Sequence, residues 1–215
     1  MRNPAKASRL DRAGLVAVLA AWLGVWGAWI PHKTVSLTQN ALNLAEWSTM
    51  LNDVRFGPYA QTPDMLRLAV ALASVALAVA AGFAGRPWVR WGLRAAALLP
   101  GLVLFPPYPY FLSLWRSPQF GGRFVIAVVL WLGVAASFAA DRLPGRQRRG
   151  LVVLLTVLAL ALGGRAHLVL RGPFSAHYNA ALLPGWGLVV FVLGLLAAAA
   201  AHGWALAARK RKRAS

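Results

Sequence analysis

Six apolar segments, each near the roughly 20 residues that a helix needs to cross the hydrocarbon core of a bilayer, dominate the hydrophobicity pattern. They cover residues 13–30, 65–84, 95–113, 123–140, 151–170 and 185–207. The pattern predicts an all-α integral membrane protein in which residues 1–215 form a single polytopic domain with six transmembrane helices.

Basic residues precede the first segment, so a cleaved signal peptide is an alternative to a first transmembrane helix. The segment is long, however, and carries Trp22, Trp26 and Trp29, with no convincing small-x-small cleavage site before Pro31. We therefore expect an uncleaved first helix.

The Lys and Arg side chains indicate the orientation. Six crossings with the N-terminus inside place 16 of them on the cytoplasmic side and 7 outside. If the third segment dipped in and out instead of crossing, the counts would be 11 and 12. Because cytoplasmic loops carry the excess of basic residues, we expect six crossings, both termini in the cytoplasm and a basic cytoplasmic tail at 208–215.

Composition agrees with lipid as the solvent, because 59% of the residues are hydrophobic, 13% are charged and the formal net charge is +18. The basic residues lie between apolar segments rather than on one face of a domain, so we expect no nucleic-acid partner. Expected partners are the bilayer, anionic lipids at the cytoplasmic face, and other membrane subunits or further copies of the chain. The excess of Ala, Arg, Leu and Gly suggests a bacterial plasma (inner) membrane.

The long outer loop, residues 31–64, contains three of the five acids: Glu46, Asp53 and Asp64. Within it, residues 36–53 have the spacing of a short amphipathic helix, with Ser36 and Gln39 as a capping box. Such a helix would lie along the outer membrane surface, or pack on the tops of the transmembrane helices.

The third segment carries Pro100, Pro106, Pro107 and Pro109. Proline removes a backbone donor, so a broken helix of the kind that lines transporter sites is one interpretation. The other is a helix that ends near Phe105 and an extended segment at the outer interface.

Polar side chains that gather on the outer side form a candidate site for an anionic head group or for acid–base chemistry. The alternative is an ordinary solvated surface. The candidates are Glu46, Asp53, Asp64, Arg116, Arg165, His167, Arg171 and His177, with His32 nearby in the first outer loop.

Motif searches are negative. The chain has no cysteine, no phosphate-binding glycine loop, no nucleophile elbow and no HExxH, so we expect no cofactor and no metal. Ser74, Ser137 and Thr156 are expected to be helix-packing hydroxyl groups. The hexapeptide AALLPG at 96–101 and 180–185 raises, weakly, the question of an inverted repeat.

These observations favour a non-enzymatic component, either a transport-related protein or a subunit of a membrane complex. The alternative is a membrane enzyme that acts on a lipid or lipid-linked substrate at the outer leaflet.

Overall fold

The computed structural model describes residues 9–32, 38–105 and 118–214. In these residues the protein is helical and contains no strand, apart from one isolated antiparallel bridge between Ile30 and Gln39. The all-α prediction is therefore confirmed for the described part of the chain.

Six long helices follow the order of the six predicted segments. They are α1 (Arg9–Gly24), α4 (Thr62–Ala80), α5 (Pro87–Leu104), α7 (Pro118–Ala140), α8 (Gly145–Tyr178) and α9 (Trp186–Ala214). A 3-10 turn, Ala81–Phe83, extends α4, and the two short helices α2 (Ala41–Ser48) and α3 (Asn52–Arg55) lie in the long loop.

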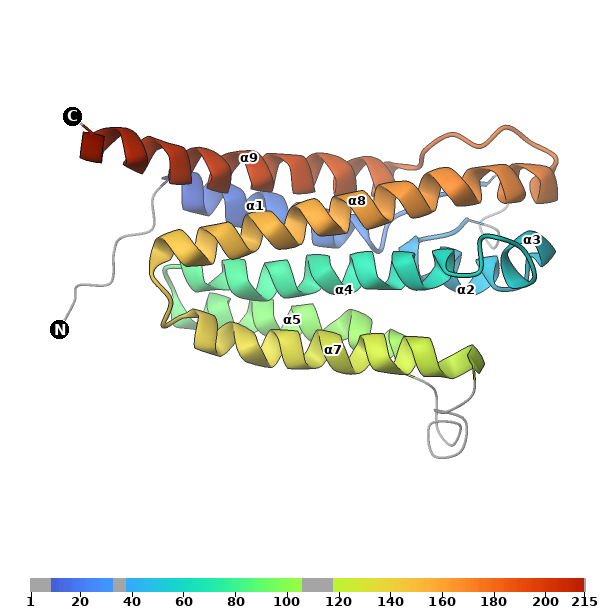
Figure 1. The fold of residues 1–215 in the computed structure, drawn as a ribbon, viewed down its shortest axis with the longest axis horizontal. Helices are drawn as coiled ribbons and strands as arrows, with labels where there is room; N and C mark the ends of the chain where they lie inside the picture. Colours follow the sequence, from blue (N-terminus) through green and yellow to red (C-terminus); the bar gives the residue numbers. More distant parts are fainter. Residues whose placement is uncertain (1–8, 33–37, 106–117, 215) are drawn as a thin grey trace.

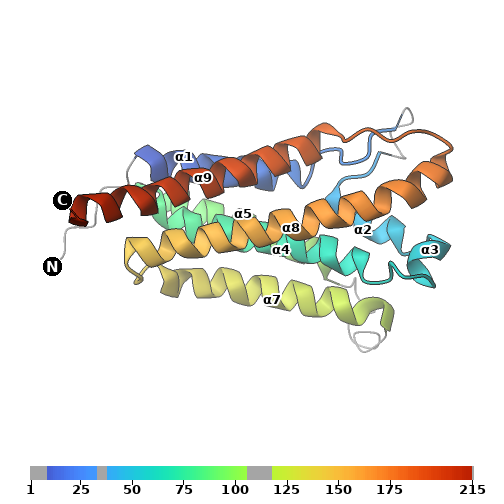
Figure 2. The same ribbon diagram turned by 45° about the horizontal axis from the view of Figure 1, so that its top comes forward.

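The six long helices run along the long axis of the molecule in alternating directions (Figures 1 and 2). One end holds the start of α1, the end of α9, and the α4–α5 and α7–α8 turns; we call it the basic end. The opposite end holds α2, α3 and the connection from α8 to α9; we call it the loop end.

Within the described residues, four helices are long and apolar enough to cross a membrane: Thr62–Phe83, Gly121–Ala140, Gly145–Tyr178 and Trp186–Ala208. The other two long helices are weaker candidates. Helix α1 has 16 residues, and α5 has 18 but includes Arg90 and Arg94, which lower its hydropathy. The structure thus supports a multi-pass membrane protein by the length and composition of four helices.

Helix α4 lies at the centre of the bundle. In its most apolar window, 78% of the residues are buried within the protein, against 28–39% in the other three candidate spans. Ala69, Ala73 and Ala76 of α4 are completely buried, and such small side chains allow neighbouring helices to approach closely.

The first predicted segment is not one continuous helix. Helix α1 ends at Gly24, and residues 25–30 continue as turns although they are as apolar as the helix. Their backbone groups find partners elsewhere: the carbonyl of Val25 accepts from Ala41 N–H at 3.2 Å, and that of Ala28 from Gly187 N–H at 2.8 Å. Non-helical backbone is tolerated in an apolar bundle where it is paired in this way.

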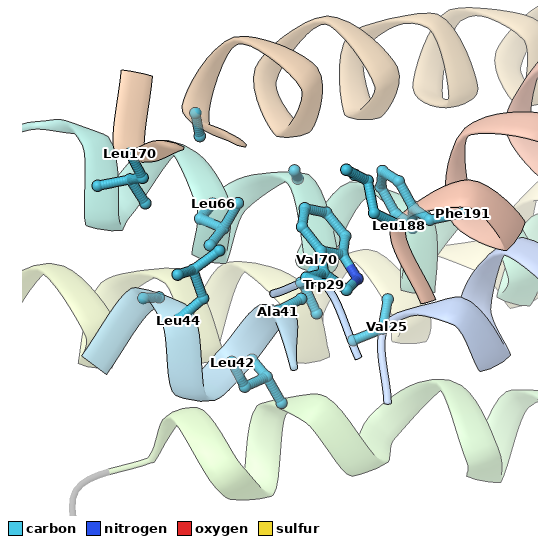
Figure 3. Packing of buried hydrophobic residues seen from close by; sticks show 14 of the residues in the cluster. Val25, Trp29, Ala41, Leu42, Leu44, Leu66, Val70, Leu170, Leu188 and Phe191 are labelled. Atoms are coloured by element: carbon cyan, nitrogen blue, oxygen red, sulfur yellow. The ribbon is translucent and has the colours of Figure 1, made fainter. Parts of the chain in front are cut away.

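Trp29 anchors this non-helical segment in the core. Its side chain is completely buried and packs 5.0 Å, centroid to centroid, from Phe191 of α9 (Figure 3). Its indole N–H donates to the carbonyl of Gly24, the last residue of α1, at 3.0 Å, and the same carbonyl accepts from Gly27 N–H at 3.3 Å. The buried indole N–H thus has a hydrogen-bond partner, and that partner is a carbonyl at the end of α1.

The predicted break at Pro100 is not found, because α5 runs through Pro100 and ends at Leu104. Pro100 and Gly101 are buried, and a Cβ at Gly101 would overlap the indole of Trp131 on α7. The helix end before Phe105 matches the second interpretation of this segment. Pro106 and Pro107 lie outside the described residues.

In the long loop, α2 begins at Ala41, with the side chain of Asn40 accepting from Asn43 N–H at 2.8 Å. The predicted start at Ser36 lies outside the described residues. Leu44 and Ala45 of α2 are completely buried in the protein. The single helix predicted over 36–53 is not found, because residues 49–51 separate α2 from α3.

Helix α8 is longer than its predicted segment. At 1.5 Å per residue, its 34 residues extend about 51 Å, well beyond a hydrocarbon core of about 30 Å.

The two AALLPG copies differ in conformation, since 96–101 are inside α5 and 180–185 form a non-helical connection. The structure thus gives the inverted repeat no support.

The hydroxyl groups within the helices bond to their own backbone. Ser74 donates to Val70 O at 2.9 Å and Ser137 to Val134 O at 2.6 Å. Thr156 donates to the carbonyls of the residues three and four positions before it. These bonds fit the expected packing role.

Candidate functional site

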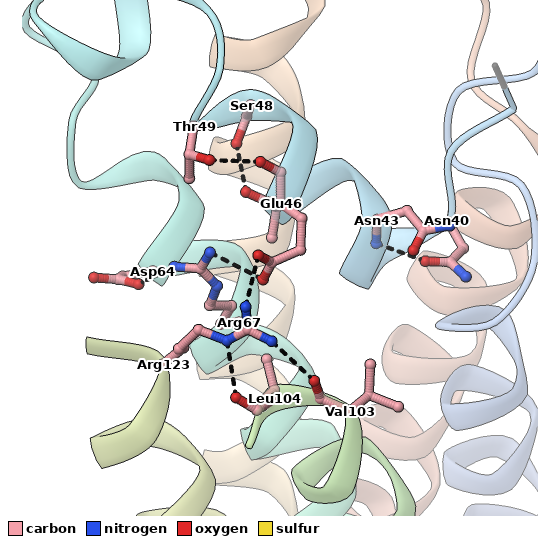
Figure 4. A network of polar contacts seen from close by, with 11 residues as sticks. Asn40, Asn43, Glu46, Ser48, Thr49, Asp64, Arg67, Val103, Leu104 and Arg123 are labelled. Atoms are coloured by element: carbon pink, nitrogen blue, oxygen red, sulfur yellow. Dashed lines mark hydrogen bonds and ion pairs between the residues drawn. The ribbon is translucent and has the colours of Figure 1, made fainter. Parts of the chain in front are cut away.

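Glu46 lies at the centre of an ion-pair network at the loop end (Figure 4). One of its carboxylate oxygens accepts from Arg67 of α4 at 3.0 Å and the other from Arg123 of α7 at 2.9 Å. Arg67 also donates to Asp64, one turn earlier on α4, at 2.6 Å. The negative charges of two carboxylates and the positive charges of two guanidinium groups therefore cancel in this network.

Arg123 ties this network to a fourth helix. It donates to the carbonyls of Leu104 at 2.9 Å and Val103 at 3.1 Å, in the last turn of α5. Carbonyls at a helix C-terminus lack partners within the helix, and a cation there is favourable. The network therefore joins α2, α4, α5 and α7.

The two kinds of charge in this network differ in exposure. The side chain of Arg67 is 5% exposed, whereas that of Glu46 is 40% exposed. The carboxylates are therefore partly exposed at the surface of the protein, and their arginine partners lie beneath them. In this arrangement they orient guanidinium groups, and they would have to give up those pairs to act as bases.

The structure brings together only part of the predicted site. Glu46 and Asp64 share the network, joined by Arg67 and Arg123, which were not among the predicted site residues. Asp53, Arg165 and His177 are exposed and are not among the residues that form this network. Arg171 donates to Leu182 O at 3.1 Å and so fixes the α8–α9 connection. Arg116 lies outside the described residues.

His167 is buried beside the non-helical segment. Its ring lies edge-on to Trp29, 6.4 Å between centroids, and its Nδ1 has no hydrogen-bond partner. In the described part of the chain, no carboxylate pairs with His167 or His177. The rings of His32 and His177 instead lie tilted against that of Tyr178, with centroid distances of 5.0 Å and 5.5 Å. The histidine and carboxylate pair expected of an acid–base site is therefore not formed by these residues.

The basic end contains a second ion-pair network, built on Asp141 in the α7–α8 turn. Arg94 approaches it at 2.9 Å, with Arg90 at 3.7 Å and Arg148 at 3.8 Å. Arg94 also donates to the carbonyls of Ala78 on α4 and Ser137 on α7, at 3.3 Å and 3.0 Å. One acid and three arginines thus connect the helices at this end.

A third pair lies deeper at the same end. Arg149 of α8 donates to both carboxylate oxygens of Asp11 on α1, at 2.7 Å and 2.8 Å. His202 of α9 lies 3.8 Å from the same carboxylate and is completely buried.

Phe83, at the end of α4, links these two networks. The guanidinium groups of Arg148 and Arg149 lie 5.4 Å and 5.9 Å from its ring centre, and the ring of His202 stacks on it at 5.2 Å. Cations over an aromatic face are attracted to its electrons. Phe83 thus contacts charged side chains from both networks.

No group of three or more potential metal-binding side chains occurs among the described residues. Neither a known protein family nor a solved structure matches the chain. Function must therefore be argued from the geometry alone.

Proposed function

We propose that this chain is a plasma-membrane protein that crosses the bilayer six times, with both termini in the cytoplasm, and acts as a non-enzymatic subunit of a membrane complex. The alternating directions of the six long helices support this topology, because the start of α1 and the end of α9 lie at one end (Figure 1).

The distribution of arginines supports the orientation. Basic residues are expected on the cytoplasmic side of the membrane, and arginines are more numerous at the basic end than toward the loop end. The basic end has Arg9, Arg12, Arg86, Arg90, Arg94, Arg142, Arg146, Arg148 and Arg149, against Arg55, Arg67, Arg123, Arg165 and Arg171 toward the other.

One observation carries the non-enzymatic assignment: four of the five carboxylates pair with arginines, and three of those four make pairs between different helices or between a helix and a turn. Charge inside an apolar bundle is costly unless it is paired. Here the pairs hold helices together, which is what a rigid subunit needs. The four acids are Asp11, Glu46, Asp64 and Asp141.

The orientation is testable by cysteine labelling, since the chain has no cysteine of its own. His177→Cys places a thiol at the loop end and Gln147→Cys one at the basic end, both at exposed positions. With a membrane-impermeant maleimide, we expect His177→Cys to react in intact cells and Gln147→Cys only after permeabilisation. The reverse pattern would contradict the proposed orientation.

The subunit role is testable by native mass measurement after extraction in mild detergent. We expect the chain in a particle of fixed stoichiometry, with other membrane subunits or with further copies of itself. A monomer that turns over a lipid-linked substrate, and loses this activity in His167→Ala, would contradict the assignment and favour an enzyme.

A further inference from the structure

The basic end holds more guanidinium groups than carboxylates. The two linked networks there contain four arginines and two acids, a formal surplus of two positive charges with neutral histidine. Their members are Arg90, Arg94, Arg148 and Arg149 with Asp11 and Asp141. Surplus charge that is partly buried attracts a further anion.

Arg90 is the member of these networks that faces outward. Its side chain is 36% exposed, and its Nη1 lies 3.7 Å from Asp141, too far for a hydrogen bond. Its Nη2 donates weakly to Ala84 O at 3.3 Å, and its Nε is buried without a hydrogen-bond partner, so the donors left for an outside group are on Nη1 and Nη2. The guanidinium group therefore keeps donors for another acceptor.

Two exposed arginines and two exposed tryptophans are near Arg90 in the sequence or next to its partner Asp141. Arg86 lies one turn earlier, since its carbonyl accepts from the Arg90 N–H at 3.2 Å. Arg142 directly follows the aspartate with which Arg90 pairs. Trp88 and Trp91, on the first turns of α5, are 67% and 62% exposed. Tryptophan side chains of this kind concentrate at the level of lipid headgroups.

We propose that Arg90, together with Arg86 and Arg142, binds the phosphate group of an anionic phospholipid in the cytoplasmic leaflet. This inference rests on the proposed membrane orientation, which assigns the basic end to that leaflet. Arginine binds phosphate through parallel N–H donors. The adjacent tryptophans favour a lipid over a soluble anion, because their apolar surface is matched by acyl chains.

The experiment uses the purified full-length chain in nanodiscs of phosphatidylcholine, with and without phosphatidylglycerol, and in detergent with inorganic phosphate. Binding of phosphatidylglycerol is measured by native mass spectrometry. We expect Arg90→Gln to weaken it about fivefold, the effect of one basic residue near an anionic surface. Arg90→Lys keeps the charge paired with Asp141 but removes the planar donors, so we expect a smaller loss.

Arg12→Gln is the matched control, because Arg12 is an exposed arginine of α1 at the same end, and the change removes the same charge. Equal weakening of phosphatidylglycerol binding by Arg12→Gln and Arg90→Gln would overturn the proposal. So would a parent chain that binds phosphatidylcholine as well as it binds phosphatidylglycerol. Inorganic phosphate bound as tightly, with the same dependence on Arg90, would overturn the lipid as ligand. A reversed labelling pattern at residues 147 and 177 would overturn the orientation alone, since lipid binding is measured on isolated protein.

Discussion

Asp11 and Arg149 illustrate how single charged residues are used in this protein. Their side chains are 2% and 5% exposed, and both carboxylate oxygens accept hydrogen bonds from the guanidinium group. Removing one partner of a buried pair leaves the other charge without compensation, which costs more than replacing both.

We expect Asp11→Asn to lower the free energy of unfolding by about 3–5 kcal/mol, and the double change with Arg149→Met to recover part of that loss. Chemical denaturation in detergent micelles measures both. Asp53→Asn alters an exposed acid and should stay within about 0.5 kcal/mol of the parent chain. A loss in Asp11→Asn no larger than in this control would show that the pair contributes little.

The sequence indicated half of the loop-end network and missed the basic-end networks. Glu46 and Asp64 stood out because they share one long loop. Asp11 and Arg149 are 138 positions apart, and helical periodicity within one segment does not report contacts between segments. The sequence does show that Asp11 and Asp141 each have arginines close by in the chain. This pattern suggests that each acid pairs with an arginine, but it does not identify which one.

Helix α1 and the segment after it lie against α9 at backbone distance. A Cβ at Gly187 would overlap the backbone of Gly27, and one at Gly24 would lie 2.6 Å from both the Gly187 carbonyl oxygen and the Phe191 nitrogen. Backbone cannot move aside as the end of a side chain can. The glycines therefore allow the non-helical segment to reach the first turn of α9.

We expect Gly187→Ala to destabilise the protein by about 1–3 kcal/mol or more, because it overpacks a contact between two backbones. Gly203, on the same helix, has open space around its Cβ position. Gly203→Ala should instead stabilise by up to about 1 kcal/mol, through helix propensity. Thermal unfolding in detergent compares the two, and equal shifts would refute the packing argument.

The positions of the long helices were predictable, but some of their ends were not. The end of α1 at Gly24 leaves no mark in hydropathy, because the apolar run continues to Ile30. Conversely, Pro100 suggested a break that α5 does not make. The fifth segment was predicted to end at residue 170, whereas α8 continues to Tyr178. Helix ends depend on contacts between segments, which composition does not contain.

For the molecule as a whole, the central place of α4 is the feature that sequence could not supply. It is about as apolar as the other candidate spans, while the buried share of its residues is twice theirs or more. Hydropathy separates lipid-compatible helices from others, but not helices that face protein from helices that face lipid.

We expect Ala76→Leu to lower the free energy of unfolding by about 1–3 kcal/mol, because Ala76 is completely buried at the centre of the bundle. Ala95→Leu makes the same change at an exposed position of α5 and should be nearly neutral. Denaturation of both variants in the same detergent is the measurement. A neutral Ala76→Leu would mean that α4 is not tightly enclosed.

The pairing of residues 28 and 29 with the start of α9 also constrains biosynthesis. The carbonyls of Ala28 and Trp29 accept from Gly187 and Gly185, which the ribosome adds about 160 residues later. At about 5–20 residues per second, the wait is roughly ten to thirty seconds. During it these carbonyls lack their final partners, and in lipid each unpaired group costs several kcal/mol. A nascent chain halted before α9 would therefore be a substrate for membrane quality control, although its first five long helices had been made.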